Sequence, residues 1–146
     1  MIALNHVLAG TLIAVVTPAE YALYIPIIAL LSHFVLDAFP HYGNDEEAPV
    51  GSRRFRRIVQ FDAVLCVAAL GLALYLYPSQ WLWLGIGAFF AAVPDVLWLL
   101  EHKAKARAAR LYFAFAKKIQ WGERSWAWSL DILYAMIMIS LLLGLS

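Results

Sequence analysis

The chain has 146 residues, of which 64% are hydrophobic and only 14% are charged, and its net charge is +1. A soluble globular domain usually has about 45–50% apolar and about 25% charged residues, and one small core cannot hide such an excess of apolar surface. The composition therefore excludes an ordinary soluble enzyme and gives no reason to expect a nucleic-acid partner. It predicts a single all-α membrane domain over residues 1–146.

Five segments approach the roughly 20 apolar residues that a membrane-spanning helix needs. Pro26 and Pro94 fall inside two of these segments, which membrane helices tolerate because neighbouring groups satisfy the freed carbonyls. The sequence thus predicts a polytopic bundle of about five transmembrane helices. The segments cover residues 2–17, 21–39, 58–77, 81–100 and 125–145.

Residues 103–119 follow a different pattern. On a helix, Ala108, Leu111 and Phe115 would share one face here, and Arg107 would lie on another. A helix of this kind lies in the plane of the membrane interface. We therefore expect one interfacial amphipathic helix in addition to the five spans, with a solvated connector as the alternative.

Basic residues fall in only two of the four connections between the predicted spans. Such connections face the cytoplasm in multi-pass proteins. The sequence therefore predicts a protein of the inner (cytoplasmic) membrane, with the N-terminus and both basic loops on the cytoplasmic side. The two loops contain all eleven Lys and Arg residues: Arg53, Arg54, Arg56, Arg57, Lys103, Lys105, Arg107, Arg110, Lys117, Lys118 and Arg124.

Ionisable side chains inside the spans share one depth. Such groups are costly in a membrane, so they usually face the bundle interior and mark a functional site. At a rise of about 1.5 Å per residue, all of them lie in one layer about 5–10 Å below the cytoplasmic interface. We expect them to meet in one buried pocket. They are His6, His33, Asp37, Asp62, Asp95 and Asp131.

Part of this layer has the spacing of a metal site. His33, Asp37 and His41 are four residues apart and would share one face of a helix that continued through Pro40. Imidazole and carboxylate ligands favour Zn²⁺, with Mn²⁺ or Fe²⁺ also suitable. Whether His41 and His102 fold back into the layer stays open. The expected ligands are His6, His33, Asp37, His41 and Asp95.

The run SHFVLDAFPHY, from Ser32 to Tyr42, resembles the SH-x-x-x-D-x-x-PH segment of the small bacterial membrane-bound metal-dependent hydrolases. His6 and the pair Pro94-Asp95 are similar to the N-terminal histidine and the P-D motif of that family. Where the family has a second carboxylate two residues after its P-D pair, this chain has a leucine. The resemblance implies a metal centre and supplies no substrate. That centre would use His6, His33, Asp37 and Asp95.

These observations predict an intramembrane metal-dependent hydrolase that acts on a lipid or lipid-phosphate at the cytoplasmic leaflet. A divalent ion would activate a water molecule and polarise the scissile group. Asp62 and Asp131 are the expected catalytic residues, with Asp62 the first choice as general base. Arginines are suited to bidentate binding of a phosphate headgroup, although they also serve as plain topogenic charge. The arginines in question are Arg53, Arg54, Arg56 and Arg57.

Two other functions stay open at this point. One is a proton or divalent-cation transporter that uses the same residues, although the layer is shallower than the midplane sites typical of transporters. The other is a non-catalytic membrane assembly protein in which the layer is a structural polar network. Hydrogen bonds between membrane helices average only about 0.6 kcal/mol, which is a modest gain for so many buried ionisable groups. The oligomeric state, including a homo-oligomer, is left open by the sequence.

Overall fold

The structure is a computed structural model that describes residues 1–43, 51–98 and 106–146. In these parts the chain is almost entirely helical, which confirms the all-α prediction. The elements, in chain order, are α1 (Ala3–Val16), η1 (Ala19–Tyr24), α2 (Ile25–Asp37), β1 (His41–Tyr42), α3 (Arg53–Leu76), η2 (Pro78–Gln80), α4 (Trp81–Trp98), α5 (Arg107–Ile119), η4 (Gln120–Gly122), β2 (Glu123–Arg124) and α6 (Trp128–Gly144).

Three helical stretches of the described chain are long and apolar enough to cross a membrane. They are Ala19–Asp37, Arg53–Leu76 and Pro78–Leu97. The apolar helices α1 and α6 are shorter, with 14 and 17 residues. The structure therefore fits a membrane protein, while a bundle of five spans and its orientation stay predictions.

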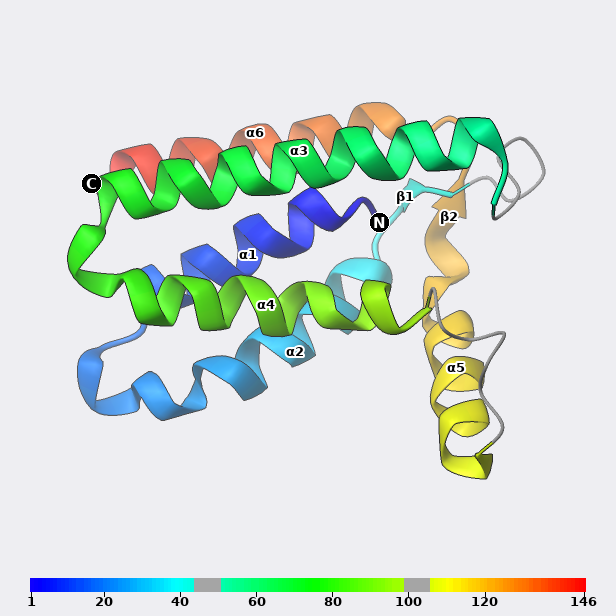
Figure 1. Cartoon of the computed structure of the whole chain (residues 1–146), viewed down its shortest axis with the longest axis horizontal. Helices are drawn as coiled ribbons and strands as arrows, with labels where there is room; N and C mark the ends of the chain where they lie inside the picture. Colours follow the sequence, from blue (N-terminus) through cyan, green and yellow to red (C-terminus); the bar gives the residue numbers. More distant parts are fainter. Residues whose placement is uncertain (44–50, 99–105) are drawn as a thin grey trace.

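Helix α1 is the centre of the bundle. Figure 1 shows it between α3 and α6 on one side and α2 and α4 on the other, and it contacts all four of these helices. Five consecutive α1 side chains, from Leu4 to Leu8, are buried. A helix that is enclosed on all sides cannot keep a polar face in water. The polar residues of α1 must therefore find partners inside the protein.

Two glycines set the distance between α1 and α4. A Cβ atom added to Gly10 would lie 2.2 Å from the carbonyl oxygen of Gly87, and one added to Gly87 would lie 2.3 Å from that of Gly10. Small residues allow membrane helices to approach this closely. The two helices are antiparallel (Figure 1), so His6, before Gly10, and Asp95, after Gly87, lie toward the same end of the bundle.

The two prolines occupy different positions in their helices. Pro26, which was expected inside the second span, lies in the first turn of α2 after the 3₁₀ segment η1. Proline is compatible with a first turn because the N–H that it lacks has no helical partner there. Pro94 lies inside α4, as expected.

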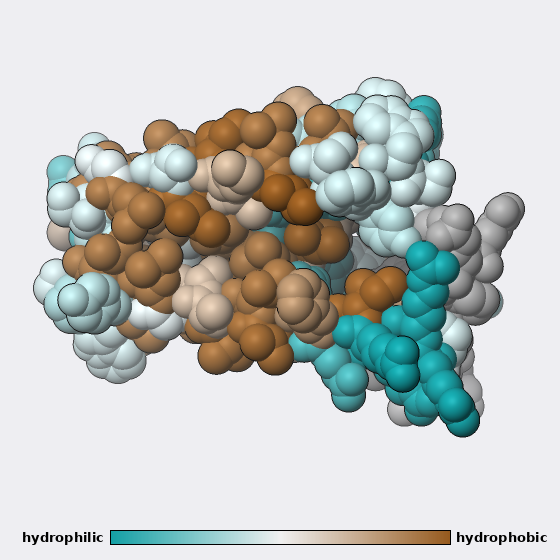
Figure 2. All heavy atoms as spheres, turned by 90° about the horizontal axis from the view of Figure 1, so that it is seen from above, coloured by the Kyte–Doolittle hydropathy of each residue, from teal (hydrophilic) through white to brown (hydrophobic). Residues whose placement is uncertain are grey.

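The amphipathic helix α5 lies across one end of the bundle (Figure 1). Its side chains Tyr112 and Phe115 pack on Phe34 of α2, with ring centroids 6.4 and 5.5 Å apart. The helix was expected from residue 103, but residues 99–105, which include His102, Lys103 and Lys105, lie outside the described part of the chain. In Figure 2, hydrophilic side chains gather at one end of a largely hydrophobic face.

A short pairing fixes α5 to the end of α2. Strands β1 and β2 are parallel, with His41 opposite Glu123 and Tyr42 opposite Arg124. Close beside them, a Cβ atom on Gly122 would lie only 2.6 Å from the carbonyl oxygen of Phe39. The segment that follows α5 is therefore held against the residues that follow α2.

Candidate metal centre

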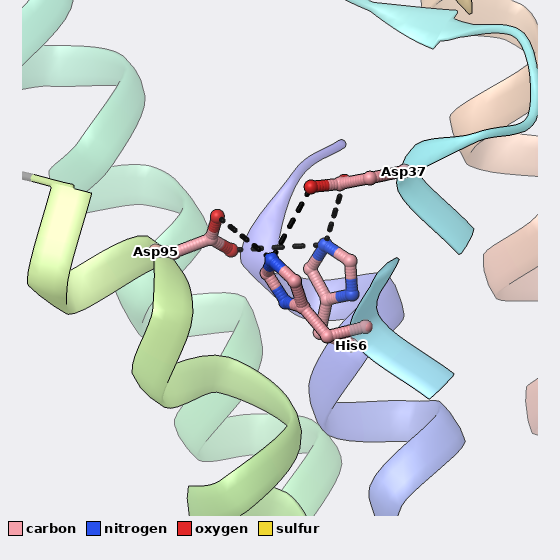
Figure 3. A group of neighbouring side chains, drawn as sticks. His6, Asp37 and Asp95 are labelled. Atoms are coloured by element: carbon pink, nitrogen blue, oxygen red, sulfur yellow. Dashed lines mark ion pairs between the residues drawn. The ribbon is translucent and has the colours of Figure 1, made fainter. Parts of the chain in front are cut away.

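Four ionisable side chains from three helices converge near one end of α1. His6 comes from α1, His33 and Asp37 from α2, and Asp95 from α4. One ligand atom from each residue lies within 4.8 Å of the others, so the set could hold a metal ion. Figure 3 shows His6, Asp37 and Asp95 pointing toward one another. We call these four residues the four-residue group.

Each imidazole of the group faces both carboxylates. His6 Nε2 lies 3.2 Å from Asp37 Oδ1 and 3.7 Å from Asp95 Oδ2. His33 Nε2 lies 3.2 Å from Asp37 Oδ2 and 3.9 Å from Asp95 Oδ1. The two rings are stacked with their centroids 3.9 Å apart. The four side chains thus surround one small space.

A backbone contact determines which nitrogen of His33 faces that space. Its Nδ1 lies 2.8 Å from the carbonyl oxygen of Ala91 and donates a hydrogen bond to it. Ala91 precedes Pro94, whose ring disturbs the hydrogen bonding of this turn of α4. In the neutral imidazole, Nε2 then carries a lone pair, and this lone pair is aimed at the carboxylate of Asp37. The arrangement is the one seen in metal-ligating histidines.

Polar atoms of the group lack partners. His6 Nδ1, His6 Nε2 and Asp95 Oδ2 are buried without a hydrogen bond. Buried polar atoms nearly always have a partner, because leaving one unpaired is costly. A divalent cation would satisfy His6 Nε2 and Asp95 Oδ2, and the two carboxylates of the group would balance its charge. The donor set therefore fits a Zn²⁺-, Mn²⁺- or Fe²⁺-type ion.

Asp37 has two further contacts that hold its carboxylate in place. The side-chain amide of Gln120, in η4, donates to Oδ2 at 3.1 Å, and the amino group of Met1 lies 3.0 Å from Oδ1. Residues that support a ligand in this way orient it and tune its affinity. No sequence signal pointed to Gln120, because an uncharged amide after an amphipathic helix has no distinctive pattern.

Asp62, the expected general base, lies beside the group rather than in it. Its Oδ2 accepts a hydrogen bond from the backbone N–H of Ala3 at 2.8 Å, and its Oδ1 accepts one from Leu4 at 3.1 Å. The first amides of a helix have no helical partner, and Ile2 offers no capping side chain. Asp62 therefore caps α1 from a different helix, α3.

Asp131 belongs to a second polar cluster. Its Oδ1 accepts from Asn5 Nδ2 at 3.1 Å, and its Oδ2 accepts from the backbone N–H of Tyr42 at 2.9 Å. Asn5 Nδ2 also donates to the carbonyl oxygen of Asp131 at 3.2 Å. We call these three residues the Asn5–Asp131 network. No sequence signal pointed to Asn5, and the structure does not bring Asp131 into the four-residue group.

His41, an expected metal ligand, is also outside the group. Helix α2 ends at Asp37, so the spacing of His41 does not continue the helical face. Its Nδ1 lies 2.8 Å from the carbonyl oxygen of Phe39, and its Nε2 lies 3.8 Å from Glu123 Oε1. Pro40 explains the change, because proline disfavours helical conformation in the residue before it.

The predicted phosphate-binding arginines begin α3. Arg53, Arg54, Arg56 and Arg57 are all exposed and do not join the group. Ser52 caps this helix by accepting a hydrogen bond from the N–H of Phe55 at 3.0 Å. The arginines therefore lie at the same end of the bundle as α5 and the N-terminus (Figure 1).

A cavity of about 450 Å³ lies next to the four-residue group, between α1, α3 and α4. Its wall is mostly apolar and includes Val7, Ile58 and Ala92, together with the acidic residues Asp62 and Asp95. Ligand sites are typically apolar cavities of about 300–1,000 Å³ with a few polar groups. Asp95 therefore connects the candidate metal ligands to a space that could receive a substrate.

No protein-family model, no curated protein and no solved structure matches this chain. The resemblance of the Ser32 to Tyr42 run to membrane-bound metal-dependent hydrolases thus stays a prediction.

Proposed function

We propose that this chain is a metal-dependent hydrolase embedded in the membrane, and that it acts on an ester or phosphoester of a lipid in the cytoplasmic leaflet. The observation that carries the proposal is the four-residue group beside an apolar cavity, with Asp95 in both. An apolar cavity in a membrane protein favours a substrate that arrives from the bilayer.

The burial of the group supports catalysis over a purely structural ion. The side chains of His6, His33 and Asp37 are at most 3% exposed, whereas that of Asp95 is 26% exposed and lines the cavity. Catalytic metal sites keep one position open, and structural ones are closed. When bound, a divalent ion would supply Lewis-acid polarisation of the scissile group and activate a water molecule at neutral pH.

We assign proton acceptance to Asp62. Asp62 lines the cavity, and each of its carboxylate oxygens already accepts one backbone hydrogen bond. A carboxylate has about four lone-pair sites, so two stay available for a proton. The two backbone contacts hold the carboxylate still, as general-base catalysis requires. Asp131, whose oxygens both serve the Asn5–Asp131 network, receives a structural role instead.

The arginines at the start of α3 suit a phosphate-containing headgroup. They are exposed at the end of the helix whose side wall forms the cavity. Arginine binds phosphate through two parallel hydrogen bonds, which fixes the orientation of the group. A phospholipid headgroup held there would keep its ester region close to Asp62.

The test is to purify the chain in detergent, determine its metal content, and follow lipid hydrolysis by mass spectrometry. Asp62→Asn keeps one of the two oxygen acceptors that cap α1 and removes the base, so we expect turnover of the folded variant to fall at least about 100-fold with unchanged metal content. Glu20→Gln, an equivalent change of an exposed residue in η1, should leave turnover unchanged. A well-folded protein without metal would contradict the proposal, and ion flux into liposomes that depends on Asp95 would favour the transporter instead.

A further inference from the structure

A second cavity lies on the other side of α3. It has a volume of about 350 Å³ and lies between α3 and α6, whereas the first lies between α3 and α4. We call them the α6-side groove and the α4-side groove. Figure 2, which views the molecule from the side of α3 and α6, shows a hollow in the hydrophobic surface with hydrophilic colour at its floor. The two grooves share four lining residues: Ile2, Tyr42, Ile58 and Asp62.

Both grooves are as deep as one leaflet of a membrane. The α4-side groove follows α3 from Phe55 to Cys66, and the α6-side groove follows α6 from Trp128 to Ile139. At about 1.5 Å per residue, each is about 16 Å long, which is close to half of a hydrocarbon core of about 30 Å. They flank the first half of α3, while buried Ala69 and Ala73 close the second half against the bundle.

The polarity of the grooves matches that of a phospholipid: apolar side chains line their length, and basic side chains lie at one end. The α6-side groove is lined by Phe61, Leu65 and other apolar side chains, and its ionisable residues are Asp62 and Asp131. Exposed arginines, including Arg57 next to the shared Ile58, lie at the basic end of α3. Such an end attracts an anionic headgroup, and the apolar grooves suit hydrocarbon.

We propose that the two grooves bind the two acyl chains of one phospholipid, whose glycerol–phosphate region lies at the shared end. This inference rests on the proposed function for its chemistry, because only the α4-side groove reaches Asp95. A lipid with a single chain, such as a polyprenyl phosphate, would use the α4-side groove and leave the α6-side groove without a role. Because the two grooves diverge from shared residues that include Asp62, we infer that the substrate class is a two-chain phospholipid.

The test measures lipid binding to the chelator-treated full chain in detergent, so that it does not depend on hydrolysis. Dioleoyl phosphatidylglycerol is the two-chain probe, and its lyso form is the one-chain probe. Ile132, on α6, lines only the α6-side groove and is 49% exposed; its neighbour Leu133 is also 49% exposed and lines neither groove. Ile132→Trp and Leu133→Trp are therefore a matched pair.

We expect Ile132→Trp to weaken binding of the two-chain probe at least about tenfold, because several methylene groups lose their contacts. Binding of the one-chain probe should not change, and Leu133→Trp should affect neither probe. On the other side, Ala63→Trp should weaken binding of both probes, whereas Ala68→Trp should not, since Ala63 alone of this pair lines the α4-side groove. Circular dichroism confirms folding, and Ile132→Phe replaces the larger substitution if that variant is unfolded.

Equal effects of Ile132→Trp and Leu133→Trp would overturn the inference, as would equal binding of the two probes or tighter binding of a polyprenyl phosphate. Failure of the hydrolase proposal is distinguishable from this. A chain that hydrolyses no lipid but shows the expected binding pattern supports the two-chain site and contradicts only the proposed reaction.

Discussion

Asn5 and His6 are neighbours on α1, yet they belong to two different polar clusters. Asn5 donates its amide to Asp131, whose second oxygen is occupied by the backbone N–H of Tyr42. Asn5 Oδ1 is buried without a hydrogen bond, and so are both ring nitrogens of His6, but His6 Nε2 faces the carboxylates of Asp37 and Asp95. Both clusters contain a buried aspartate and residues from distant parts of the chain. Of these two clusters, only the four-residue group brings ligand atoms of two imidazoles and two carboxylates within 4.8 Å of one another.

This comparison separates two reasons for placing ionisable groups in a membrane. In the Asn5–Asp131 network, a single carboxylate has a hydrogen-bond donor on each oxygen, as Asp37 has in the four-residue group, but no imidazole in the described part of the chain faces it at ligand distance. In the four-residue group, lone pairs face one another, and a cation would turn that repulsion into attraction. The convergence of several imidazoles and carboxylates on one space therefore indicates a metal site better than a single buried charged residue does. Variants that affect only one cluster can test this distinction.

The largest effect is expected in the four-residue group. His33→Ala and Asp37→Ala each remove a ligand, so the metal content of the purified protein should fall from about one ion per chain to background. Inductively coupled plasma mass spectrometry measures this directly. Asp131→Asn, which changes a buried aspartate of the other cluster, should keep the ion. If all three variants kept or lost metal alike, the two clusters would not differ as the structure indicates.

A smaller effect, on stability alone, is expected in the Asn5–Asp131 network. Asp131→Leu leaves the Tyr42 N–H without its acceptor and leaves the Asn5 amide with only the backbone carbonyl of residue 131, and an unpaired buried group costs about 1–3 kcal/mol. Thermal unfolding in detergent should therefore shift to lower temperature, while the folded protein retains its metal. Loss of metal from the folded variant at low temperature would show that Asp131 belongs to the metal centre after all.

The smallest effect is expected at Gln120, which contacts a ligand without being one. Gln120→Ala should weaken metal affinity about 10–100-fold, as is typical when a group that orients a ligand is removed, with little change in stability. A competition titration with a chelator measures the change. Gln60→Ala, on the exposed surface of α3, is the control. Equal affinities for the two variants would mean that the contact with Asp37 has no effect on the ion.

The depth of a residue in the bundle follows from its position along its helix. This is why the four members of the candidate metal centre could be predicted from the sequence. His6, His33, Asp37 and Asp95 were expected at one depth, and the structure brings them together. Direction around a helix axis is harder to predict, because successive residues point about 100° apart and the neighbouring helices must be known. Asp131 shares the predicted depth but faces the side of α1 that carries Asn5.

The remaining features had weak sequence signals for physical reasons. The pairing of His41 with Glu123 joins strands of two residues each, which is too short for a recognisable periodicity. Gln120 reaches Asp37 from 83 residues away. That contact depends on the course of the chain after α5, which no local pattern encodes.

The central position of α1 has a consequence for biogenesis. This helix precedes the other described helices in the chain. The hydrogen bond between Asn5 and Asp131 can form only after Asp131, 126 residues later, has been synthesised. At a synthesis rate of about 5–20 residues per second, Asn5 is made about 6–25 seconds before its partner. If α1 is inserted into the membrane during that interval, its polar side chain enters without its partner, and production of the protein should then be sensitive to the supply of membrane-insertion factors.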